Sequence, residues 1–288
     1  MQLAFTKMHG LGNDFVVIED LASEIDFSPE AIQWFCDRNF GVGADGLILI
    51  RPATTPEADY LMLYFNADGS AAKMCGNGIR CFTKYLVDHG ILSAKVDSLL
   101  VETLGGPKPI TFSRDHDGTM HMATVDMGAP ALSPDEIPTT LSGEQVFECP
   151  FETPYGTFQI TAVSMGNPHV VIWVDDIDDA PVDTVGPYIE THEAFPAKTN
   201  VEFAQFLGDD TIALRVWERG VGETLACGTG ACATLVAASL SCLVGRAATV
   251  RLPGGELRIH WDEDGHVYMT GPATQTFLGT IELPEDDA

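Results

Sequence analysis

The sequence carries two cysteines in similar surroundings, Cys75 in MCGNGIRC and Cys227 in LACGTGAC. Each is followed by a Gly-x-Gly turn and then by an apolar segment that is typical of a helix. Each cysteine is therefore expected at a helix N-terminus, where unpaired backbone N–H groups and the helix dipole favour a thiolate. The same N–H groups can bind a carboxylate. The pattern predicts two helix starts that each combine a reactive thiol with an anion-binding site.

The two motifs belong to a wider internal duplication. Three pairs of residues keep nearly the same offset along the chain: Cys75 and Cys227 (152 residues), Asn66 and Glu218 (152), and Asn13 and Asn167 (154). The segment GNDFVVI in the first half also corresponds to GNPHVVI in the second. Such regular spacing indicates two copies of one fold. If the copies pack about a pseudo-twofold axis, the two cysteines face each other.

Two facing acid/base groups are what inversion of a stereocentre requires. One group removes the α-hydrogen from one face of the carbon, and the other returns a proton to the opposite face. Each sulfur would lie roughly 3 to 3.5 Å from that carbon. An amino-acid α-hydrogen is much less acidic than a thiol, and each pKa unit of mismatch costs about 1.4 kcal/mol. Two helix N-termini at the α-carboxylate would stabilise the developing charge, so the reaction needs no pyridoxal phosphate or other cofactor.

The elements that hold the cysteines are predicted to form an α+β fold. In the first half, a strand over 60–65 leads into Asn66, and a helix runs from the Cys75 turn to about His89, with Gly90 as its cap. In the second half, strands over 158–163 and 170–174 flank the GNPH segment, and the helix after Cys227 is expected to reach about residue 244. Each half is expected to be a curved, mostly antiparallel sheet wrapped around a central helix, with the active site in the cleft between the halves.

The expected boundaries follow from the duplication. The first half spans residues 1–125, and the second spans 126–274. A last strand over about 275–286 is a candidate to return to the first half. Another helix is expected to begin at Ser28-Pro29-Glu30 and to run to about residue 38, because Ser is a good N-cap and Pro suits the first helical position.

Composition excludes several classes of function. The chain has 42 acidic and 15 basic residues, a formal net charge of -27, which would repel nucleic acid and anionic membranes. The apolar run 225–244 approaches the length that spans a bilayer, but it contains polar residues and is interpreted as a buried core helix. No secretory signal is visible, which predicts a cytoplasmic protein. The seven cysteines form no CxxC pair, so reduced thiols are expected and no metal site.

Over its whole length the chain resembles the diaminopimelate epimerase family of cofactor-independent enzymes. The resemblance rests on GLGNDF, NADGS, MCGNGIRC, GNPH, TNVEF, ERGVGETLACGTG and the GPA of 271–273. It implies interconversion of LL- and meso-diaminopimelate in lysine and peptidoglycan precursor synthesis, with Cys75 as proton donor and Cys227 as proton acceptor, exchanging roles with direction. It also implies a homodimer. The substrate-binding residues that it implies are Asn13, Asn66, Asn167, Asn200, Glu218 and Arg219 for the remote end, and Gly76, Asn77, Gly228 and Thr229 for the reacting end.

One position departs from the family pattern. Gly46 stands in ADGL, where many relatives carry a glutamine that contacts the substrate. The departure puts that contact in doubt and leaves the reaction unchanged.

The residues alone support the same roles. A substrate with a distal ammonium and carboxylate calls for one acidic and one basic partner, and adjacent Glu218 and Arg219 suit it, Arg through its bidentate fork. Taken singly, this pair reads equally well as a surface ion pair, and Asn13 or Asn167 as a turn residue. His169 either lines the site or makes a structural hydrogen bond. The remaining cysteines are interpreted as small buried hydrophobes: Cys36, Cys81, Cys149, Cys232 and Cys242.

Two other functions compete with this interpretation. A proline racemase or hydroxyproline epimerase would share the paired cysteines, but a cyclic imino acid has no distal ammonium and carboxylate for Glu218 and Arg219 to bind. A noncatalytic amino-acid-binding protein would bind substrate without exchanging its α-hydrogen. A deuterium-exchange assay distinguishes these possibilities.

Overall fold

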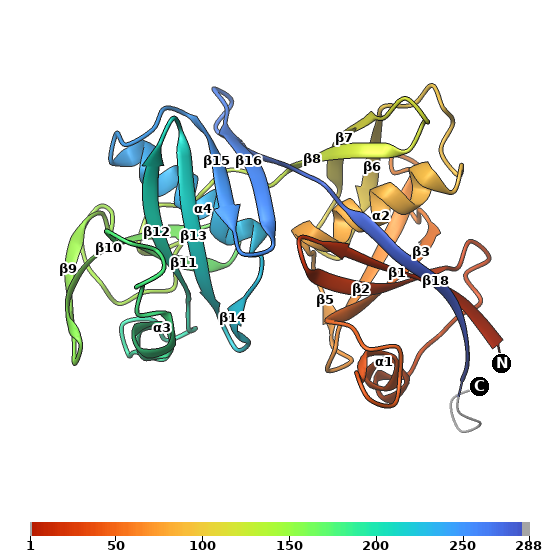
Figure 1. The fold of residues 1–288 in the computed structure, drawn as a ribbon, viewed down its shortest axis with the longest axis horizontal. Coiled ribbons are helices and arrows are strands. Elements are labelled where there is room, and N and C mark those ends of the chain that lie inside the picture. Colours follow the sequence, from red (N-terminus) through yellow and green to blue (C-terminus); the bar gives the residue numbers. More distant parts are fainter. Residues whose placement is uncertain (1, 284–288) are drawn as a thin grey trace. The chain divides into compact units, whose positions relative to one another are not determined.

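The computed structural model describes residues 2–283 of the chain. These residues form two compact units. Unit 1 comprises the chain up to Val125 together with the chain from Gly271 onward, and unit 2 comprises Asp126–Thr270. Figure 1 labels their helices and strands.

Unit 1 contains a mixed, mostly antiparallel sheet and two helices. Its elements are β1 (Gln2–Gly10), β2 (Asn13–Glu19), α1 (Pro29–Cys36), β3 (Gly46–Pro52), β4 (Tyr60–Asn66), β5 (Ala71–Ala72), α2 (Gly76–Asp88), β6 (Ser98–Glu102), β7 (Lys108–Arg114), β8 (Met120–Asp126) and β18 (Thr274–Glu282). Parallel pairs join β2 to β3 and β4 to β6. Antiparallel pairs join β18 to β1, β1 to β2, β3 to β4, β4 to β5, β6 to β7 and β7 to β8.

Unit 2 repeats this architecture. Its elements are β9 (Cys149–Thr153), β10 (Gly156–Ser164), β11 (Pro168–Trp173), α3 (Val182–Glu190), β12 (Asn200–Gly208), β13 (Thr211–Glu218), β14 (Gly222–Thr224), α4 (Gly228–Leu240), β15 (Ala247–Leu252), β16 (Gly255–Trp261) and β17 (Val267–Gly271). Parallel pairs join β11 to β12 and β13 to β15, which correspond to the two parallel pairs of unit 1. The other pairs are antiparallel. The predicted α+β class with duplicated halves is confirmed.

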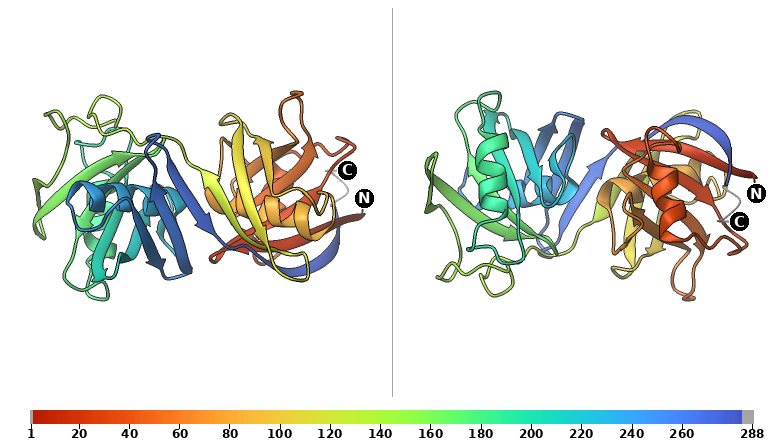
Figure 2. Two further views of the ribbon diagram at one scale, coloured as in Figure 1. Left: turned by 90° about the horizontal axis from the view of Figure 1, so that it is seen from above. Right: turned by 90° about the horizontal axis from the view of Figure 1, so that it is seen from below.

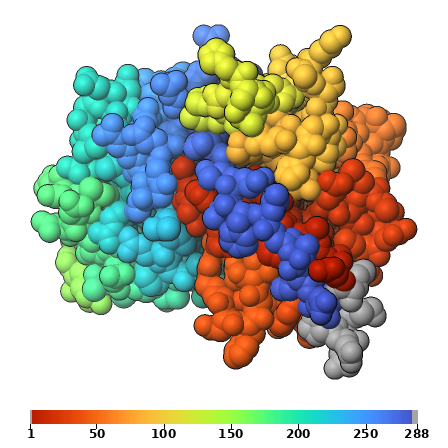
Figure 3. All heavy atoms as spheres, turned by 45° about the vertical axis from the view of Figure 1, so that its right-hand side comes forward, coloured from red at the N-terminus to blue at the C-terminus, as the bar shows by residue number. Residues whose placement is uncertain are grey.

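One strand of unit 1 comes from the far end of the chain. β18 pairs with the outer side of β1, from Gln2 opposite Glu282 to His9 opposite Thr274. In Figure 3 this blue strand lies over the red N-terminal strand. In unit 2 the equivalent place beside β10 is taken by β9, the strand that precedes β10 in sequence. Of the strand expected over 275–286, the residues after 283 lie outside the described part of the chain.

A central helix lies against the sheet of each unit (Figure 2). α2 contacts β1, β2, β3, β4 and β18, and α4 contacts β10, β11, β12, β15 and β16. The helices bury their apolar residues, for example Ile79 and Phe82 of α2 and Leu235 and Val236 of α4. Because α4 is apolar on nearly every side, it can only be accommodated in a core.

The expected end of α4 is wrong. The helix stops at Leu240, with Ser241 as its C-cap, instead of continuing to residue 244. Cys242 then adopts a left-handed backbone conformation with φ 56°, and the N–H of Leu243 bonds back to the carbonyl of Ala238. This capping arrangement ends the helix before Gly245, and a continuous apolar run gave no sign of it.

Helix α3 was not anticipated from the sequence. Pro187 lies inside it, where a proline normally argues against a helix. The helix is nevertheless held by packing, because Val182, Val185 and Ile189 are buried in the core of unit 2.

Among residues 2–283, no helix is both long and apolar enough to cross a membrane. The run over 225–244 that approaches bilayer length contains α4, a buried helix of 13 residues. Its interpretation as a core helix is confirmed.

Candidate active site

Both motif cysteines lie at helix N-termini, as predicted. Cys75 is the N-cap of α2, and its sulfur accepts a hydrogen bond from the N–H of Gly78 at 3.4 Å. Cys227 is the N-cap of α4, and its sulfur accepts from the N–H of Gly230 at 3.4 Å. The two turns therefore have the same local geometry, in which a backbone donor points at the sulfur and favours its thiolate.

In unit 1, the candidate residues of the Cys75 turn and of β2 lie together. The Oδ1 of Asn13 accepts from the Nδ2 of Asn77 at 3.1 Å and lies 3.8 Å from the sulfur of Cys75. The Nδ2 of Asn13 donates to the Oδ2 of Asp45 at 2.8 Å. Because a carboxylate only accepts, this bond orients the asparagine with its oxygen toward the cysteine.

Charged residues hold this asparagine from behind. Asp14 makes ion pairs with Lys7 at 2.5 Å and with Arg38 at 2.8 Å, and Arg38 also pairs with Asp45 at 2.7 Å. Burial alone would raise the pKa of Asp14, but hydrogen bonds from Arg38 and Lys7 outweigh it and lower the pKa to about 2. The Asp14 carboxylate therefore stays ionised at neutral pH, and the cluster fixes the loop that carries Asn13.

A fully buried arginine supports the start of α2. Arg80 donates from Nη1 to the carbonyl of Gly76 at 3.0 Å, from Nη2 to the Oδ1 of Asn77 at 3.1 Å, and from Nε to the carbonyl of Pro272 at 3.0 Å. Its guanidinium thus links the Cys75 turn to the GPA segment, which lies at the other end of the sequence.

Asn66 stands apart from this hydrogen-bonded group. It ends β4, and its Nδ2 donates to the Oγ of Ser70 at 3.0 Å within the same turn. Gly46 lies opposite it in the β3–β4 pair. A Cβ on Gly46 would lie 2.5 Å from the carbonyl oxygen of Phe65 and 2.7 Å from the ring of Tyr64. Glycine is therefore required here by the neighbouring strand, and a side chain as long as glutamine has no room.

This gives a test of the departure from the family pattern. Gly46→Gln is expected to lower the free energy of unfolding by about 1 to 3 kcal/mol, because the new side chain must displace a backbone oxygen or the Tyr64 ring. Urea denaturation measures the change. Gly245→Ala is the matched control, since a Cβ there meets nothing within 4 Å. Equal stability of Gly46→Gln and the parent protein would contradict the steric argument.

In unit 2, the Cys227 turn is linked to β11 by hydrogen bonds. The Nδ2 of Asn167 donates to the Oγ1 of Thr229 at 3.3 Å, and this oxygen lies 3.6 Å from the sulfur of Cys227. His169 bonds to the Oδ1 of Asn167 through Nε2 at 3.0 Å, and to the Oε1 of Glu202 through Nδ1 at 2.7 Å. Of the two roles considered for His169, the structure shows the hydrogen-bonded one: the ring is fully buried.

Glu218, Arg219 and Asn200 form the other part of the unit 2 group. The N–H of Arg219 donates to the Oδ1 of Asn200 at 3.0 Å, and its guanidinium donates to the carbonyl of Ala197 at 3.0 Å. Thr224 donates to Glu218. Among residues 2–283, neither Glu218 nor Arg219 takes part in an ion pair. The surface ion-pair interpretation therefore fails, and within the described part of the chain the arginine fork has no carboxylate partner.

A buried glutamate shapes the turn that carries this arginine. Glu190, the last residue of α3, accepts from the N–H of Gly220 at 2.9 Å, from the Nε1 of Trp217 at 2.8 Å and from the Nζ of Lys198 at 3.3 Å. These bonds fix both sides of the turn that begins at Glu218.

The environment of Cys227 opposes ionisation in the absence of substrate. Burial raises the pKa of its thiol well above the ordinary value, and the nearby Glu218 and Glu202 raise it further. Hydrogen bonds from Thr229 and from the N–H of Gly230 act in the other direction. Burial also raises the pKa of Glu218. A cationic group bound among these residues would favour both the thiolate and the carboxylate.

The other cysteines are mostly as expected. Cys36, Cys81 and Cys232 are buried, and burial raises the pKa of Cys81 to about 12, which makes it a poor nucleophile. Cys149 is partly buried. The expectation for Cys242 is wrong: it is exposed, because α4 ends before it.

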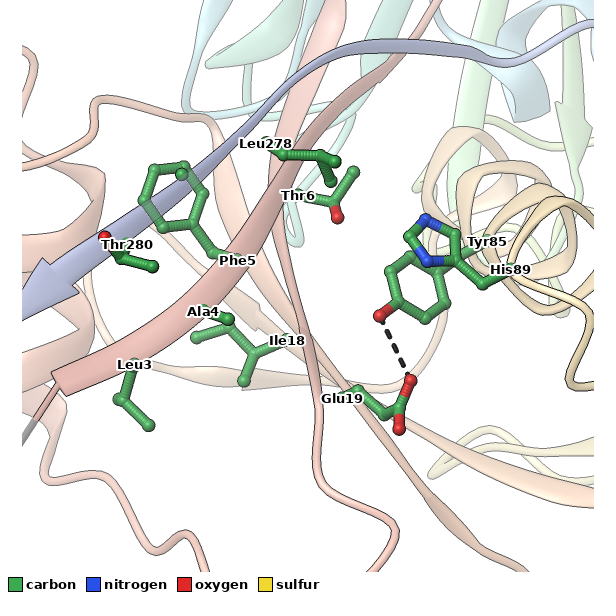
Figure 4. A pocket seen from close by; sticks show the side chains of 11 residues that line it. Leu3, Ala4, Phe5, Thr6, Ile18, Glu19, Tyr85, His89, Leu278 and Thr280 are labelled. Atoms are coloured by element: carbon green, nitrogen blue, oxygen red, sulfur yellow. Dashed lines mark hydrogen bonds between the residues drawn. The ribbon is translucent and has the colours of Figure 1, made fainter.

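A pocket of about 670 Å³ lies elsewhere in unit 1, between β1, β18 and α2 (Figure 4). Tyr85 donates to Glu19 at 3.1 Å and stacks on His89 with ring centroids 4.0 Å apart. None of the candidate site residues lines this pocket. In the described part of the chain, no group of three or more His, Cys, Asp or Glu residues is arranged to hold a metal ion.

Sequence reasoning missed three residues that position the candidate site: Asp45, Arg80 and Glu202. A signal existed for two of them. Glu202 interrupts the apolar strand NVEFAQF at a buried position, and Arg80 falls on the apolar side of α2. Asp45 lies in a glycine-rich loop, whose path the sequence does not predict.

Solved structures with the same architecture define the class of the fold. A hydroxyproline epimerase from Agrobacterium vitis matches with a TM-score of 0.72 and 15% identity, covering 99% of this chain and 93% of that one. A phenazine biosynthesis protein from Bacillus anthracis matches with a TM-score of 0.72 and 15% identity, covering 98% and 100%. The chain thus has the same fold as these two proteins, and in this chain a cysteine caps the central helix of each repeated unit.

Sequence comparison identifies the family within that class. The diaminopimelate epimerase family model matches residues 5–133 and 161–276. A diaminopimelate epimerase from Pelotomaculum thermopropionicum is 50% identical over 96% of this chain and 97% of its own length, and one from Leptospira biflexa is 47% identical over 98% and 100%. The chain belongs to the diaminopimelate epimerase family, and its members are isomerases.

Proposed function

We propose that this chain interconverts LL- and meso-2,6-diaminopimelate by proton transfer at the α-carbon, without a cofactor. The observation that supports this most strongly is the family: relatives named diaminopimelate epimerase share 45–50% identity over nearly the full length. The repeated geometry of the two cysteine turns fits a reaction that needs one base and one acid.

In the proposed mechanism, Cys75 and Cys227 reach opposite faces of the α-carbon. One acts as thiolate and removes the α-hydrogen, while the other acts as thiol and returns a proton, and the roles exchange with direction. The N–H groups at the starts of α2 and α4 hold the α-carboxylate and stabilise the negative charge that develops on it. Gly76, Asn77, Gly228 and Thr229 supply this end of the site.

The remote end of the substrate is proposed to bind Glu218 and Arg219. The carboxylate at that end would take the free donors of the arginine fork, and the ammonium would pair with Glu218, whose burial makes it depend on a cationic partner. The four asparagines complete this part of the site: Asn13, Asn66, Asn167 and Asn200.

The enzyme is proposed to work in the cytoplasm as a homodimer, in the synthesis of lysine and peptidoglycan precursors. Its partners are the small-molecule substrate and a second copy of the chain, and nucleic acid is not among them, because the net charge is -27.

The test is direct. Purified protein in deuterated water should convert LL-diaminopimelate to meso-diaminopimelate and place deuterium at the inverted carbon, as measured by chiral chromatography and mass spectrometry. Proline and trans-4-hydroxy-L-proline serve as competing substrates, because the fold alone is shared with enzymes named for them. Epimerisation of the cyclic substrates and not of diaminopimelate would reject the proposal. Binding of diaminopimelate without exchange would indicate a binding protein.

A further inference from the structure

The two cysteine turns differ in what lies behind them. In unit 1 the positions behind the start of α2 are occupied by Phe15 and Ile48, and in unit 2 the equivalent positions, each 154 residues later, hold His169 and Glu202. All four side chains are fully buried. A Cβ on Gly78 would meet Ile48 at 3.2 Å, and a Cβ on Gly230 would meet the Oε1 of Glu202 at 2.7 Å. An apolar pair in one unit is thus replaced by a polar pair in the other.

Glu202 lies close to the reactive sulfur of its unit. The same Cβ position on Gly230 is 3.2 Å from the sulfur of Cys227, so the sulfur and the carboxyl oxygen lie within about 6 Å of each other. Burying a carboxyl group in a core costs free energy unless the group is hydrogen-bonded or paired with a charge. An isoleucine fills the equivalent place in unit 1.

A chain of hydrogen bonds connects this carboxyl group to the sulfur. It runs from Glu202 to His169 (2.7 Å), from His169 to Asn167 (3.0 Å), from Asn167 to Thr229 (3.3 Å) and from Thr229 to Cys227 (3.6 Å). We call these five residues the Glu202 relay.

The relay has a direction. The Nδ2 of Asn167 donates to Thr229, so its Oδ1 must accept, and the Nε2 of His169 must carry a hydrogen. Nδ1 of His169 faces the Oε1 of Glu202 at 2.7 Å, so one proton lies between these two atoms. By its charge Glu202 raises the pKa of the Cys227 thiol, and the hydrogen-bond chain that it anchors acts in the opposite direction. Since the oxygen of Thr229 already accepts from Asn167, its own hydrogen is free to point at the sulfur of Cys227.

Unit 1 is polarised in the opposite sense. Asn13, the counterpart of Asn167, has its Nδ2 bound to Asp45 and presents its oxygen to Cys75. An oxygen beside the sulfur favours a thiol, whereas a hydroxyl donor beside it favours a thiolate. The sulfur of Cys227 also has the carboxyl group of Glu218 as a partner, and the hydroxyl of Thr229 acts against it by lowering the pKa of the thiol.

We propose that Glu202 is a positioning residue for the reaction: through His169, Asn167 and Thr229 it holds a hydroxyl donor on the sulfur of Cys227 and thereby supports proton abstraction by that cysteine and not by Cys75. This inference rests on the proposed function, because it takes both cysteines as proton-transfer groups. Glu202 itself touches no reacting atom.

The experiment separates the two cysteines by using single-cysteine backgrounds. In deuterated water, Cys75→Ala protein leaves only Cys227 to exchange an α-hydrogen of diaminopimelate, and Cys227→Ala leaves only Cys75. Glu202→Ile copies the residue of unit 1 and removes the anchor of His169. We expect it to slow exchange by Cys227 about 10- to 100-fold, and to leave exchange by Cys75 within about threefold of its parent.

Two further variants guard against a merely structural effect. Glu202→Gln should keep the rate of exchange by Cys227 within about threefold, because its amide can donate to Nδ1 and preserve the hydrogen on Nε2. The double variant His169→Phe with Glu202→Ile gives unit 2 the apolar pair of unit 1, removes both buried polar side chains of that pair together, and should slow exchange by Cys227 as much as Glu202→Ile does. Circular dichroism checks that all variants fold.

Each other outcome overturns the inference. Equal slowing in both backgrounds would make Glu202 a structural residue, and unchanged exchange by Cys227 in Glu202→Ile would remove its role. Slowing in the double variant alone would assign the effect to His169. If Cys75→Ala exchanges nothing although the intact enzyme epimerises diaminopimelate, Cys227 is not a base, and the inference fails together with the two-base mechanism while the proposed conversion of diaminopimelate stands.

A substrate-free measurement applies if the proposed function itself fails. The titratable groups that face Cys227 are Glu218, Glu202 and His169. The ultraviolet absorbance of the Cys227 thiolate, taken as the difference between Cys75→Ala and the protein that lacks both cysteines, should appear at higher pH in Glu202→Ile than in Glu202→Gln. The same pH in both would overturn the relay.

Discussion

In deuterated water, Cys75→Ala is expected to label only one of LL- and meso-diaminopimelate, and Cys227→Ala only the other. In the proposed mechanism each thiol reaches one face of the α-carbon, so the remaining cysteine removes a proton from a single diastereomer and returns a solvent deuteron to the same face. Inversion should fall by about 100- to 10,000-fold in both variants, because its general acid or base is missing. Mass spectrometry of the separated diastereomers measures both effects.

Cysteines elsewhere in the same helices supply the controls. Cys81 of α2 and Cys232 of α4 are fully buried and lie beyond the first turn, so Cys81→Ala and Cys232→Ala should keep complete inversion even if they lose some stability. Substantial inversion by either active-site variant, or labelling of the same diastereomer by both, would mean that the proton transfer is done by other groups.

Replacement of Arg219 by lysine should damage turnover severely although the charge is kept. We expect kcat/KM for diaminopimelate to fall about 10- to 100-fold, because an ammonium cannot make the two parallel hydrogen bonds of the planar fork. The backbone N–H of Arg219 would still bind Asn200, so the turn should persist. Steady-state kinetics measures the loss, and a rise in KM without a fall in kcat would show that the fork acts equally on the ground state and the transition state.

Arg251→Lys is the matched control for this change. Arg251 makes an exposed ion pair with Glu256 at 2.7 Å, and such pairs contribute little. Near-normal kcat/KM in Arg219→Lys, equal to that of the control, would exclude a role for the fork in binding the substrate.

Much of the local structure around the cysteines could be predicted from the sequence. A Cys-Gly-x-Gly turn before an apolar run specifies a helix start, since glycines let the backbone N–H approach the sulfur, and both caps have this form. Fixed offsets between repeated segments predicted the duplication, because two copies of one fold must keep their landmarks in register.

Other features depend on tertiary contacts that no local pattern reports. Helix α3 contains Pro187 and is stabilised by its buried face, so local propensity argues against it. The end of α4 is set by the left-handed conformation of Cys242. From the sequence alone, the left-handed residue that ends the helix could equally well have been Gly245. Asp45 becomes a partner of Asn13 only when a loop 32 residues away folds beside it.

The pairing of β1 with β18 has a consequence for the order in which the chain can fold. Gln2 pairs with Glu282, so unit 1 is discontinuous in sequence, whereas unit 2 is an uninterrupted stretch from Asp126 to Thr270. During synthesis unit 2 can therefore fold as soon as its own residues have emerged, while β1 still lacks its outer partner and leaves one edge of unit 1 unpaired. Leu3 and Phe5 are both buried in the finished fold, and they stay more exposed to solvent until β18 has been synthesised and has paired with β1. The sheet edge that closes last is thus also the one most open to pairing with another chain.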